Sequence, residues 1–184
     1  MKKLSVVILP AIIAALIVIS GCTTRIKVDD APVAASMPSG KLERGKAVYI
    51  AIPHDGTYGD KVYSGSGKQA ALALHLALAQ YASPVIMGEK YEDQTTALES
   101  AKAKNAKYVF VPLITNWVHR KAAWSGRASG VSMTVSVFDL TSASGNQLVM
   151  QKDLRVQGRN VTFKSQYPEE ILKPLCVNFA QEIY

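Results

Sequence analysis

The apolar run at residues 47–52 constrains the fold more than any other feature of the chain. Its residues, Ala-Val-Tyr-Ile-Ala-Ile, show no alternation of polar and apolar side chains, and Pro53 ends the run. A strand of this composition is typical of a sheet that is covered on both faces. We therefore expect a domain of the α/β type, in which helices pack on a central sheet.

Helices are predicted on either side of a short second strand. Residues 68–81 consist mainly of Ala and Leu, and few sides of this predicted helix are polar. Such a helix is usually buried, so we expect it between the sheet and another element. Residues 84–88 form the second strand. Thr96 and Glu99 then match a Thr-x-x-Glu capping box, which predicts a helix over residues 96–105.

The C-terminal half continues with strands and ends in a helix. Residues 107–118 read as a third strand, in which Pro112 indicates an edge position or a bulge. Residues 131–137 alternate as in a strand with one wet face, and residues 148–159 return as its hairpin partner. A last helix begins at Pro168. The order β-α-β-α-β-β-β-α predicts an α/β (α+β) fold, a mixed sheet of about five strands with helices packed on it.

Two of these segments resemble those of known proteins. The strand from Lys107 to Trp117 looks like the central strand of small periplasmic α/β domains, such as the N-terminal domain of TolB and the CsgG-like lipoproteins. The hairpin with Asp139-Leu-Thr and Gly145 resembles theirs as well. As a whole, residues 46–184 are similar to a family of uncharacterised small lipoproteins of Gram-negative bacteria. The resemblance implies fold and compartment, and it transfers no activity.

The N-terminus has the pattern of a signal peptide. Two lysines precede the apolar residues 4–19, and the segment ends in Ile19-Ser20-Gly21-Cys22. The alternative is an uncleaved anchor helix, because the apolar run approaches the length of a membrane span. The last four residues decide for the signal, since they resemble the lipobox of bacterial lipoproteins. That resemblance implies cleavage between Gly21 and Cys22, a diacylglycerol on the Cys22 thiol and three acyl chains, palmitate among them.

This interpretation divides the chain into three parts. Residues 1–21 are a removable signal, residues 22–46 are a lipid-bearing N-terminus with a flexible tether, and residues 47–184 are a single globular domain. Several acyl chains make a stable anchor. Thr23 stands where the enterobacterial sorting rule requires aspartate for retention in the inner membrane. We therefore expect a lipoprotein on the periplasmic face of the outer membrane.

Charge and cysteine content narrow the classes of partner. The formal net charge is +7, and without the two leader lysines it is about +5. This charge is too small and too scattered to indicate nucleic acid, but it would favour anionic lipid or an acidic envelope protein. If Cys22 is acylated, Cys176 has no partner within the chain. It lies on the apolar stripe of the last helix, so we expect a buried free thiol.

Recognisable motifs for catalysis, metals or cofactors are missing, and we predict none of these. Gly65-Ser66-Gly67 precedes a helix but lacks the spacing of a phosphate loop, so it either holds an anion on free amides or is a turn capped by Ser66. Asp55 follows a histidine in a loop, where a site or a plain turn is expected. The histidines show no metal-ligand spacing to a second histidine or a cysteine: they are His54, His75 and His119.

One stretch of the chain gives a functional hint. No Asp or Glu occurs between Glu99 and Asp139, and both tryptophans lie there. Tryptophan and arginine are enriched at binding hot spots. The alternation of residues along the strand places Trp117 on the same face as Val109, packed against the sheet. The alternative to a contact surface in this stretch is a solvated hairpin end. The predicted contact patch consists of Arg120, Lys121, Trp124 and Arg127.

Two functions remain open at this point. The first is a non-enzymatic binding or accessory module of the cell envelope, tethered to a membrane, and the lack of motifs favours it. The second is a hydrolase that acts on cell-wall or lipid substrates through an unrecognised site. A pocket in which His54 and Asp55 converge would favour the hydrolase, whereas a flat basic and aromatic patch would favour the binding module.

Overall fold

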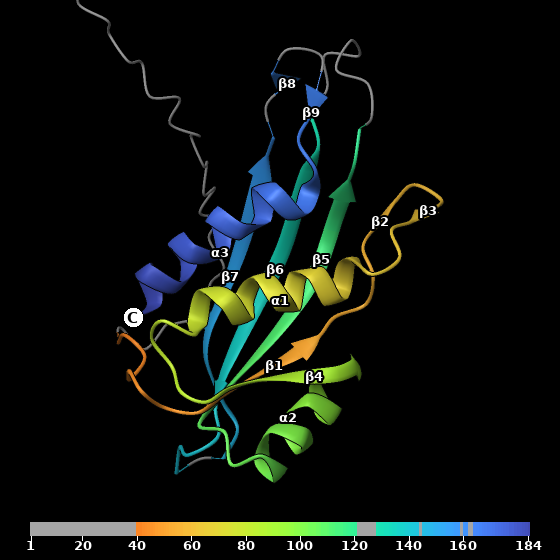
Figure 1. Ribbon diagram of the computed structural model, residues 1–184. Helices are drawn as coiled ribbons and strands as arrows, with labels where there is room; N and C mark the ends of the chain where they lie inside the picture. The colour runs from red at the N-terminus through yellow and green to blue at the C-terminus, as the bar shows by residue number, and fades with distance from the viewer. Residues whose placement is uncertain (1–39, 121–127, 144, 159, 162–163) are drawn as a thin grey trace, which may run out of the picture.

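A computed structural model describes residues 40–120, 128–143, 145–158, 160–161 and 164–184. Its five-stranded mixed sheet has the order β4-β1-β5-β6-β7 (Figure 1). The strands are β1 (Val48–Ile52), β4 (Val85–Tyr91), β5 (Tyr108–Val118), β6 (Gly130–Asp139) and β7 (Gln147–Gln157). The helices are α1 (Ser66–Leu78), α2 (Gln94–Ala103) and α3 (Pro168–Ile183). The α/β fold class and the order of these main elements are confirmed.

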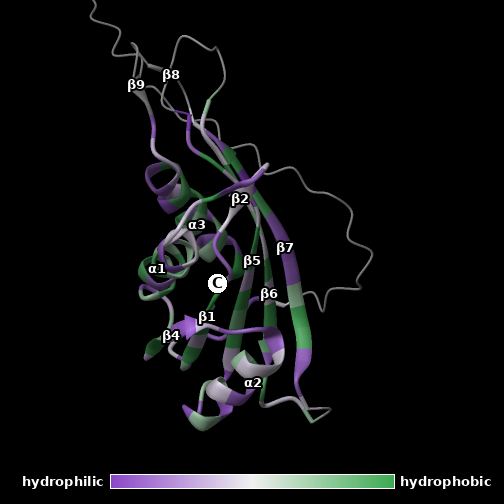
Figure 2. Ribbon diagram, turned by 90° about the vertical axis from the view of Figure 1, so that its right-hand side faces the viewer, coloured by the Kyte–Doolittle hydropathy of each residue, from purple (hydrophilic) through white to green (hydrophobic). Residues whose placement is uncertain are grey.

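The helices cover the two faces of the sheet unequally. α1 and α3 pack side by side on one face, and α2 lies on the other face near one end (Figures 1 and 2). β1 pairs in parallel with β4 on one side and with β5 on the other. Because α1 and α2 cross on opposite faces, all residues of β1 are buried, as the apolar run at 47–52 predicted.

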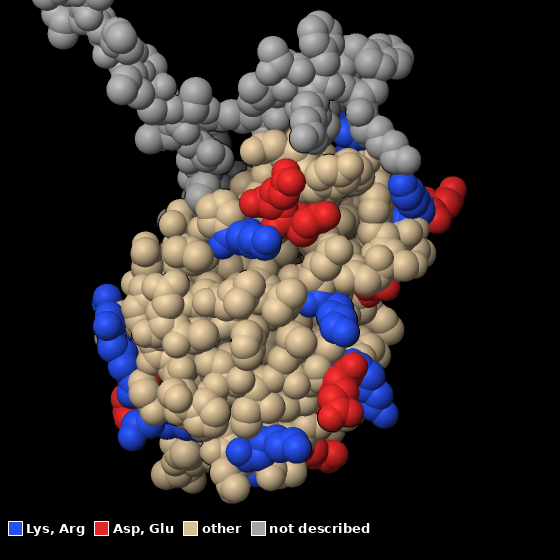
Figure 3. Space-filling model, viewed as in Figure 1, with Lys and Arg blue, Asp and Glu red and all other residues tan. Residues whose placement is uncertain are grey.

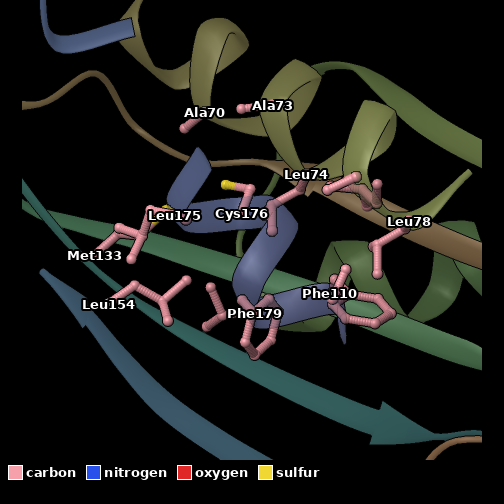
Figure 4. Close-up of a cluster of buried hydrophobic side chains, with 14 of the residues drawn as sticks. Ala70, Ala73, Leu74, Leu78, Phe110, Met133, Leu154, Leu175, Cys176 and Phe179 are labelled. Carbon is pink, nitrogen blue, oxygen red and sulfur yellow. The ribbon is translucent and has the colours of Figure 1, made fainter. Parts of the chain in front are cut away.

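Two hydrophobic cores follow from this arrangement. The larger one lies between the sheet and the pair α1 and α3, and the smaller one lies beneath α2. Cys176 points into the larger core together with Leu74 and Phe110 (Figure 4). Its side chain is a free thiol that is fully buried, and burial raises the pKa of Cys176 to about 12. The expected buried thiol is thus present.

The burial expected all round α1 is wrong for its outer side. Leu74 and Leu78 are fully buried, whereas Leu72 and Leu76 are 45% and 53% exposed. The helix packs with its inner side on the sheet and beside α3, and no described element covers its outer side. The Ala and Leu content of this segment predicts burial on all sides. A helix at the edge of a layer, however, needs an apolar surface only on the side that faces the sheet.

The start of α2 also differs from the expectation. The helix begins two residues before Thr96, and its N-cap is Asp93, whose carboxylate accepts a hydrogen bond from the Thr96 backbone N at 2.8 Å. The Thr-x-x-Glu capping box is therefore wrong. Leu98 and Ala101 are buried, as expected. In contrast, α3 begins at Pro168 as predicted and continues through Pro174 as one helix.

A bulge in β5 changes which face Trp117 occupies. The register of β5 against β6 shifts between Ile114 and Asn116. Beyond this bulge the alternation is inverted, so Trp117 is buried in the larger core, whereas Val109 belongs to the smaller one. Trp117 is packed as expected, but on the opposite face. Pro112 lies where β1 no longer pairs with β5, so the strand is locally an edge there.

Two short hairpins and the segment before β1 complete this framework. The expected loop after β1 contains the hairpin of β2 (Thr57–Tyr58) and β3 (Lys61–Val62), and a second small hairpin consists of β8 (Asn160–Val161) and β9 (Lys164–Ser165). Residues 40–46, which the sequence assigned to the tether, include Leu42, which is buried against the larger core. The packed part of the chain therefore begins before residue 47.

Candidate functional site

The β2–β3 hairpin brings two side chains beside the far end of β5. Tyr58 faces Lys61 across the hairpin. Gly56, just before the hairpin, lies so close to β5 that a Cβ atom there would be 2.5 Å from the Trp117 Cβ. A glycine at this position allows the hairpin to lie against the strand, and this contact places Tyr58 next to the residues that follow β5.

Those residues are His119 and Arg120. The Arg120 Nη2 donates a hydrogen bond to the Tyr58 hydroxyl at 3.0 Å, and its Cζ lies 5.3 Å from the centre of the Tyr58 ring. The backbone N of Arg120 donates to the Ser129 Oγ at 3.2 Å. Arg120, a member of the predicted contact patch, is thus held across the face of an aromatic ring by contacts at both of its ends.

Two further tyrosines continue this surface toward α3. The His119 backbone N donates to the Tyr63 hydroxyl at 3.4 Å, and the Lys61 Nζ lies 4.6 Å from the Tyr63 ring centre. The His119 ring is tilted by 45° against Tyr167 at 4.5 Å between centres. We call this set the aromatic-cationic cluster: Tyr58, Lys61, Tyr63, His119, Arg120 and Tyr167.

The cluster has the properties of a contact surface. Tyr58 and Tyr167 are each 45% exposed, and Val62 beside them is 59% exposed. Among the described residues, neither Lys61 nor Arg120 takes part in an ion pair. Their charged groups lie over tyrosine rings, and no carboxylate of the described residues pairs with them, so they remain available to an anionic group.

Sequence reasoning found only one member of this cluster. Arg120 belongs to it, whereas Lys121, Trp124 and Arg127 lie outside the described residues, as do Gly21 and Cys22. The tyrosines of the hairpin were missed because their segment was read as a loop. The usable signal was a pair of tyrosines between glycines, close to Lys61, before an apolar helix.

The His54–Asp55 loop does not form a converging site. The Asp55 carboxylate accepts hydrogen bonds from the backbone N of Gly67 at 2.8 Å and of Gly65 at 3.0 Å. Asp55 thus provides the anion at the start of α1, and Ser66 does not cap this helix, since its Oγ accepts from the Gly56 backbone N at 2.8 Å. His54 instead stacks on Tyr91 at 3.4 Å between ring centres.

A second carboxylate is buried in a structural role. Glu92 is 8% exposed and accepts hydrogen bonds from the Tyr49 hydroxyl at 2.7 Å and the Ser100 Oγ at 2.6 Å. These bonds join α2 to β1. Burial, followed by the bond to Glu92, raises the pKa of Tyr49 to about 12.

The described residues contain no cluster of His, Cys, Asp and Glu suited to a metal ion. None of the described helices has the length and apolarity needed to span a membrane.

Comparison with solved structures shows where this fold occurs. A dodecamer of a single-substitution PelC variant from Paraburkholderia phytofirmans superposes with a TM-score of 0.56 at 18% identity, covering 78% of this chain and 93% of that chain. A PelC dodecamer from the same organism, in another space group, gives 0.54 at 18% identity, with 76% and 91% covered. At this identity the likeness shows a shared fold. A lipoprotein from Neisseria meningitidis gives only 0.40 at 5% identity, with 61% and 80% covered, which is too slight to bear on the fold or the function.

Sequence comparison places the chain in a family. No curated protein matches it. A family model described as a domain of unknown function, DUF4823, matches residues 40–183. The match begins at the first described residue and ends in the last turn of α3. Since this match covers well over half of the chain, the protein belongs to the DUF4823 family.

Proposed function

We propose that this protein is a lipid-anchored, non-enzymatic binding module of the Gram-negative cell envelope, and that the aromatic-cationic cluster is its contact surface. The observation that carries the proposal is the position of Arg120 on the exposed ring of Tyr58, with no ion pair among the described residues. Tyrosine and arginine dominate binding hot spots because they combine large apolar area with directed hydrogen bonds.

The proposed anchor is the acylated Cys22, on the periplasmic face of the outer membrane. Its support is the lipobox-like Ile19-Ser20-Gly21-Cys22 behind a basic and apolar leader, with Thr23 after it. The likeness to TolB-type and CsgG-like periplasmic domains belongs to the same proposal.

The hydrolase alternative finds no support in the geometry around its proposed residues. A general base needs a free carboxylate or imidazole within reach of a reacting group. The Asp55 carboxylate is occupied by two backbone amides, and the His54 ring stacks on Tyr91. Glu92 is bound to two hydroxyl groups inside the domain.

Site-specific photo-crosslinking in living cells tests the contact surface. A photoreactive phenylalanine analogue replaces Val62 beside the cluster in one variant and Tyr91 in a control, so that the contact between Tyr58 and Arg120 stays intact. The two replaced side chains are 59% and 44% exposed. Only the Val62 position is expected to give an adduct of defined mass. Adding Arg120→Ala should abolish that adduct while the far-ultraviolet spectrum and the unfolding midpoint stay unchanged.

Either of two results would refute this proposal. One is an equally strong adduct from Tyr91, which would remove the distinction between the cluster and the rest of the surface. The other is an adduct from Val62 that survives both Arg120→Ala and Lys61→Ala. Mass spectrometry of the mature N-terminus tests the anchor separately, and an unmodified Cys22 would contradict it.

A second candidate function is self-assembly, which the outer side of α1 favours. Figure 3 shows a broad uncharged area over α1, where Leu72 and Leu76 are exposed at positions i and i+4. The structural relative PelC is described as a dodecamer. We propose that α1 contacts a second copy of this chain, because apolar area of this kind is stabilised by burial between subunits.

Light scattering during size-exclusion chromatography tests self-assembly. The soluble domain should give a mass that grows with concentration, and the double variant Leu72→Glu, Leu76→Glu should remain a monomer at every concentration. Leu148→Glu is the matched control, because Leu148 is also exposed but lies on β7. A monomeric wild-type domain at millimolar concentration would contradict this candidate.

A further inference from the structure

The chain enters the domain at the C-terminal ends of α1 and α3. The Leu42 backbone N donates to the Ile183 carbonyl at 2.8 Å, and the Gly45 backbone N donates to the Tyr81 carbonyl at 2.7 Å. Leu42 is buried, and the Arg44 guanidinium lies 5.0 Å from the centre of the Tyr81 ring. The position at which the N-terminal segment joins the domain is therefore fixed by several contacts.

The aromatic-cationic cluster lies at the opposite ends of the same helices. Tyr167 is the N-cap of α3, and the Tyr63 carbonyl accepts a hydrogen bond from the backbone N of Ser66, the first residue of α1. α3 has 16 residues, so the two ends of the domain are about 24 Å apart along this helix at 1.5 Å per residue. Figure 1 shows this separation, with β2 and β3 far from the C-terminus.

In the anchored protein, the distance between the cluster and the membrane determines how strongly lipid headgroup charges act on the cluster. A membrane that holds the chain through Cys22 is nearer to the point at which the chain joins the domain than to the cluster, which lies about 24 Å farther along α3. The Debye length at physiological ionic strength is about 8 Å, so headgroup charges are screened long before they reach it.

We infer that the aromatic-cationic cluster faces away from the anchoring membrane and binds an acidic segment of a protein. This inference rests on the proposed function, namely on the anchor at Cys22 and on the cluster as the contact surface. Lys61 and Arg120 supply two positive charges on aromatic rings. Of the nearby acids, Asp60 lies in the hairpin turn, and the Glu170 carboxylate accepts a bond from the Tyr167 backbone N at 3.2 Å.

The geometry of the cluster suits an extended acidic peptide. Tyr58 and Tyr167 offer exposed rings at its two ends, and Arg120 can direct its remaining guanidinium donors to a carboxylate. Aromatic faces contribute contact area at low entropic cost, and charge complementarity selects acidic sequences over basic ones. Aspartate and glutamate side chains on one strand would meet Lys61 and Arg120 in turn.

Quenching by lipid tests the orientation. Val62→Cys at the cluster and Lys41→Cys near the start of the domain each receive one fluorophore, since the Cys176 thiol is fully buried and Cys22 carries lipid in the anchored protein. In vesicles with headgroup-quencher lipids, the label at residue 41 should be quenched and the label at residue 62 should not. Equal quenching at both positions would overturn the inference.

Binding of a defined probe tests the partner class. The anchored protein is titrated with a fluorescent ten-residue glutamate peptide, and separately with added phosphatidylglycerol vesicles. We expect salt-sensitive peptide binding that Lys61→Ala and Arg120→Ala each weaken by about tenfold, with Lys90→Ala on β4 as an unaffected control. Binding of the vesicles without the peptide would overturn this inference and leave the proposed contact surface intact. If neither probe depends on Arg120, both proposals fail.

Discussion

At the scale of single residues, Asp55 explains why the glycine-rich segment before α1 is not an anion site. The backbone amides of Gly65 and Gly67 at the start of α1 have no acceptor within the helix, and they lie at the positive end of the helix dipole. Both amides donate to the Asp55 carboxylate. The chain therefore supplies its own anion, and α1 is coupled to the segment that leaves β1.

Replacing this carboxylate should destabilise the domain. In Asp55→Ala, two backbone amides lose their acceptor and the helix loses a favourable charge, so we expect a loss of about 1–2 kcal/mol in the free energy of unfolding. Urea denaturation measures it. Asp60→Asn is the control, because Asp60 lies exposed in the hairpin turn, and it should leave the midpoint unchanged. Equal midpoints for Asp55→Ala and the wild type would contradict the capping role.

At the scale of elements, the sequence predicted the type of each helix and strand better than the side that each one buries. The main strands and helices were predicted because their hydrophobic periods are clear. The bulge beside Ile114 was not, since one extra residue leaves no mark in composition yet moves Trp117 to the other face. The exposed side of α1 was missed for a related reason: Ala and Leu fill both sides of a helix that the sheet covers on only one.

The candidate site was predictable only where its residues are close in sequence. Arg120 could be found because it stands in a long stretch without acids. Its partner Tyr58 is 62 residues away. No local pattern records that a hairpin after β1 lies against β5. The contact depends on tertiary packing through Gly56, which a single sequence does not reveal.

The packing of α1 leads to a prediction about its leucines. Leu74→Ala should lower the free energy of unfolding by about 2–5 kcal/mol, because a fully buried side chain leaves a cavity. Leu76→Ala should cost well under about 1 kcal/mol, since its side chain is 53% exposed. Both variants are compared by guanidinium denaturation at dilutions where the domain is monomeric. Similar costs at the two positions would show that the helix is rotated.

Gly56 provides a matching test for the hairpin. A Cβ atom at this position would meet the Ile114 Cγ2 at 2.7 Å as well as the Trp117 Cβ, so Gly56→Ala should cost about 1–3 kcal/mol through overpacking. Gly40→Ala is the control, because nothing lies within 4 Å of a Cβ there. The measurement is thermal unfolding followed by circular dichroism. A hairpin that moves away without cost would give both variants the same midpoint and also loosen the Arg120 contact.

At the scale of the whole molecule, three buried side chains keep their protons to a pH above their ordinary pKa. Cys176 lies in the larger core, Tyr49 in the smaller core and Tyr184 at the C-terminus beside Tyr81. Burial is the main cause that raises the pKa of each of the three groups to about 12. None of them can ionise in the folded state without exposing an anion to an apolar interior.

These groups predict how stability depends on alkaline pH. A raised folded pKa favours the protonated form, so each contribution is complete below the unfolded pKa and is lost as the pH rises to the folded pKa. The unfolded pKa is 9.0 for the Cys176 thiol and 10.0 for each tyrosine, and the folded pKa is about 12 in all three. The free energy of unfolding should therefore begin to fall near pH 9, where only the thiol contributes, and should fall more steeply above pH 10.

The thiol can be separated from the tyrosines by its earlier onset. Between pH 8 and 10 the wild-type domain should lose about 1 kcal/mol that Cys176→Ala does not lose, because alanine has no proton to release. The comparison uses the slope of the free energy of unfolding against pH, since the substitution also shifts the free energy itself by opening a small cavity. Tyr49→Phe should instead keep the slope near pH 9 and flatten it between pH 10 and 12. Parallel slopes for all three proteins up to pH 12 would mean that the buried groups reach water before the domain unfolds.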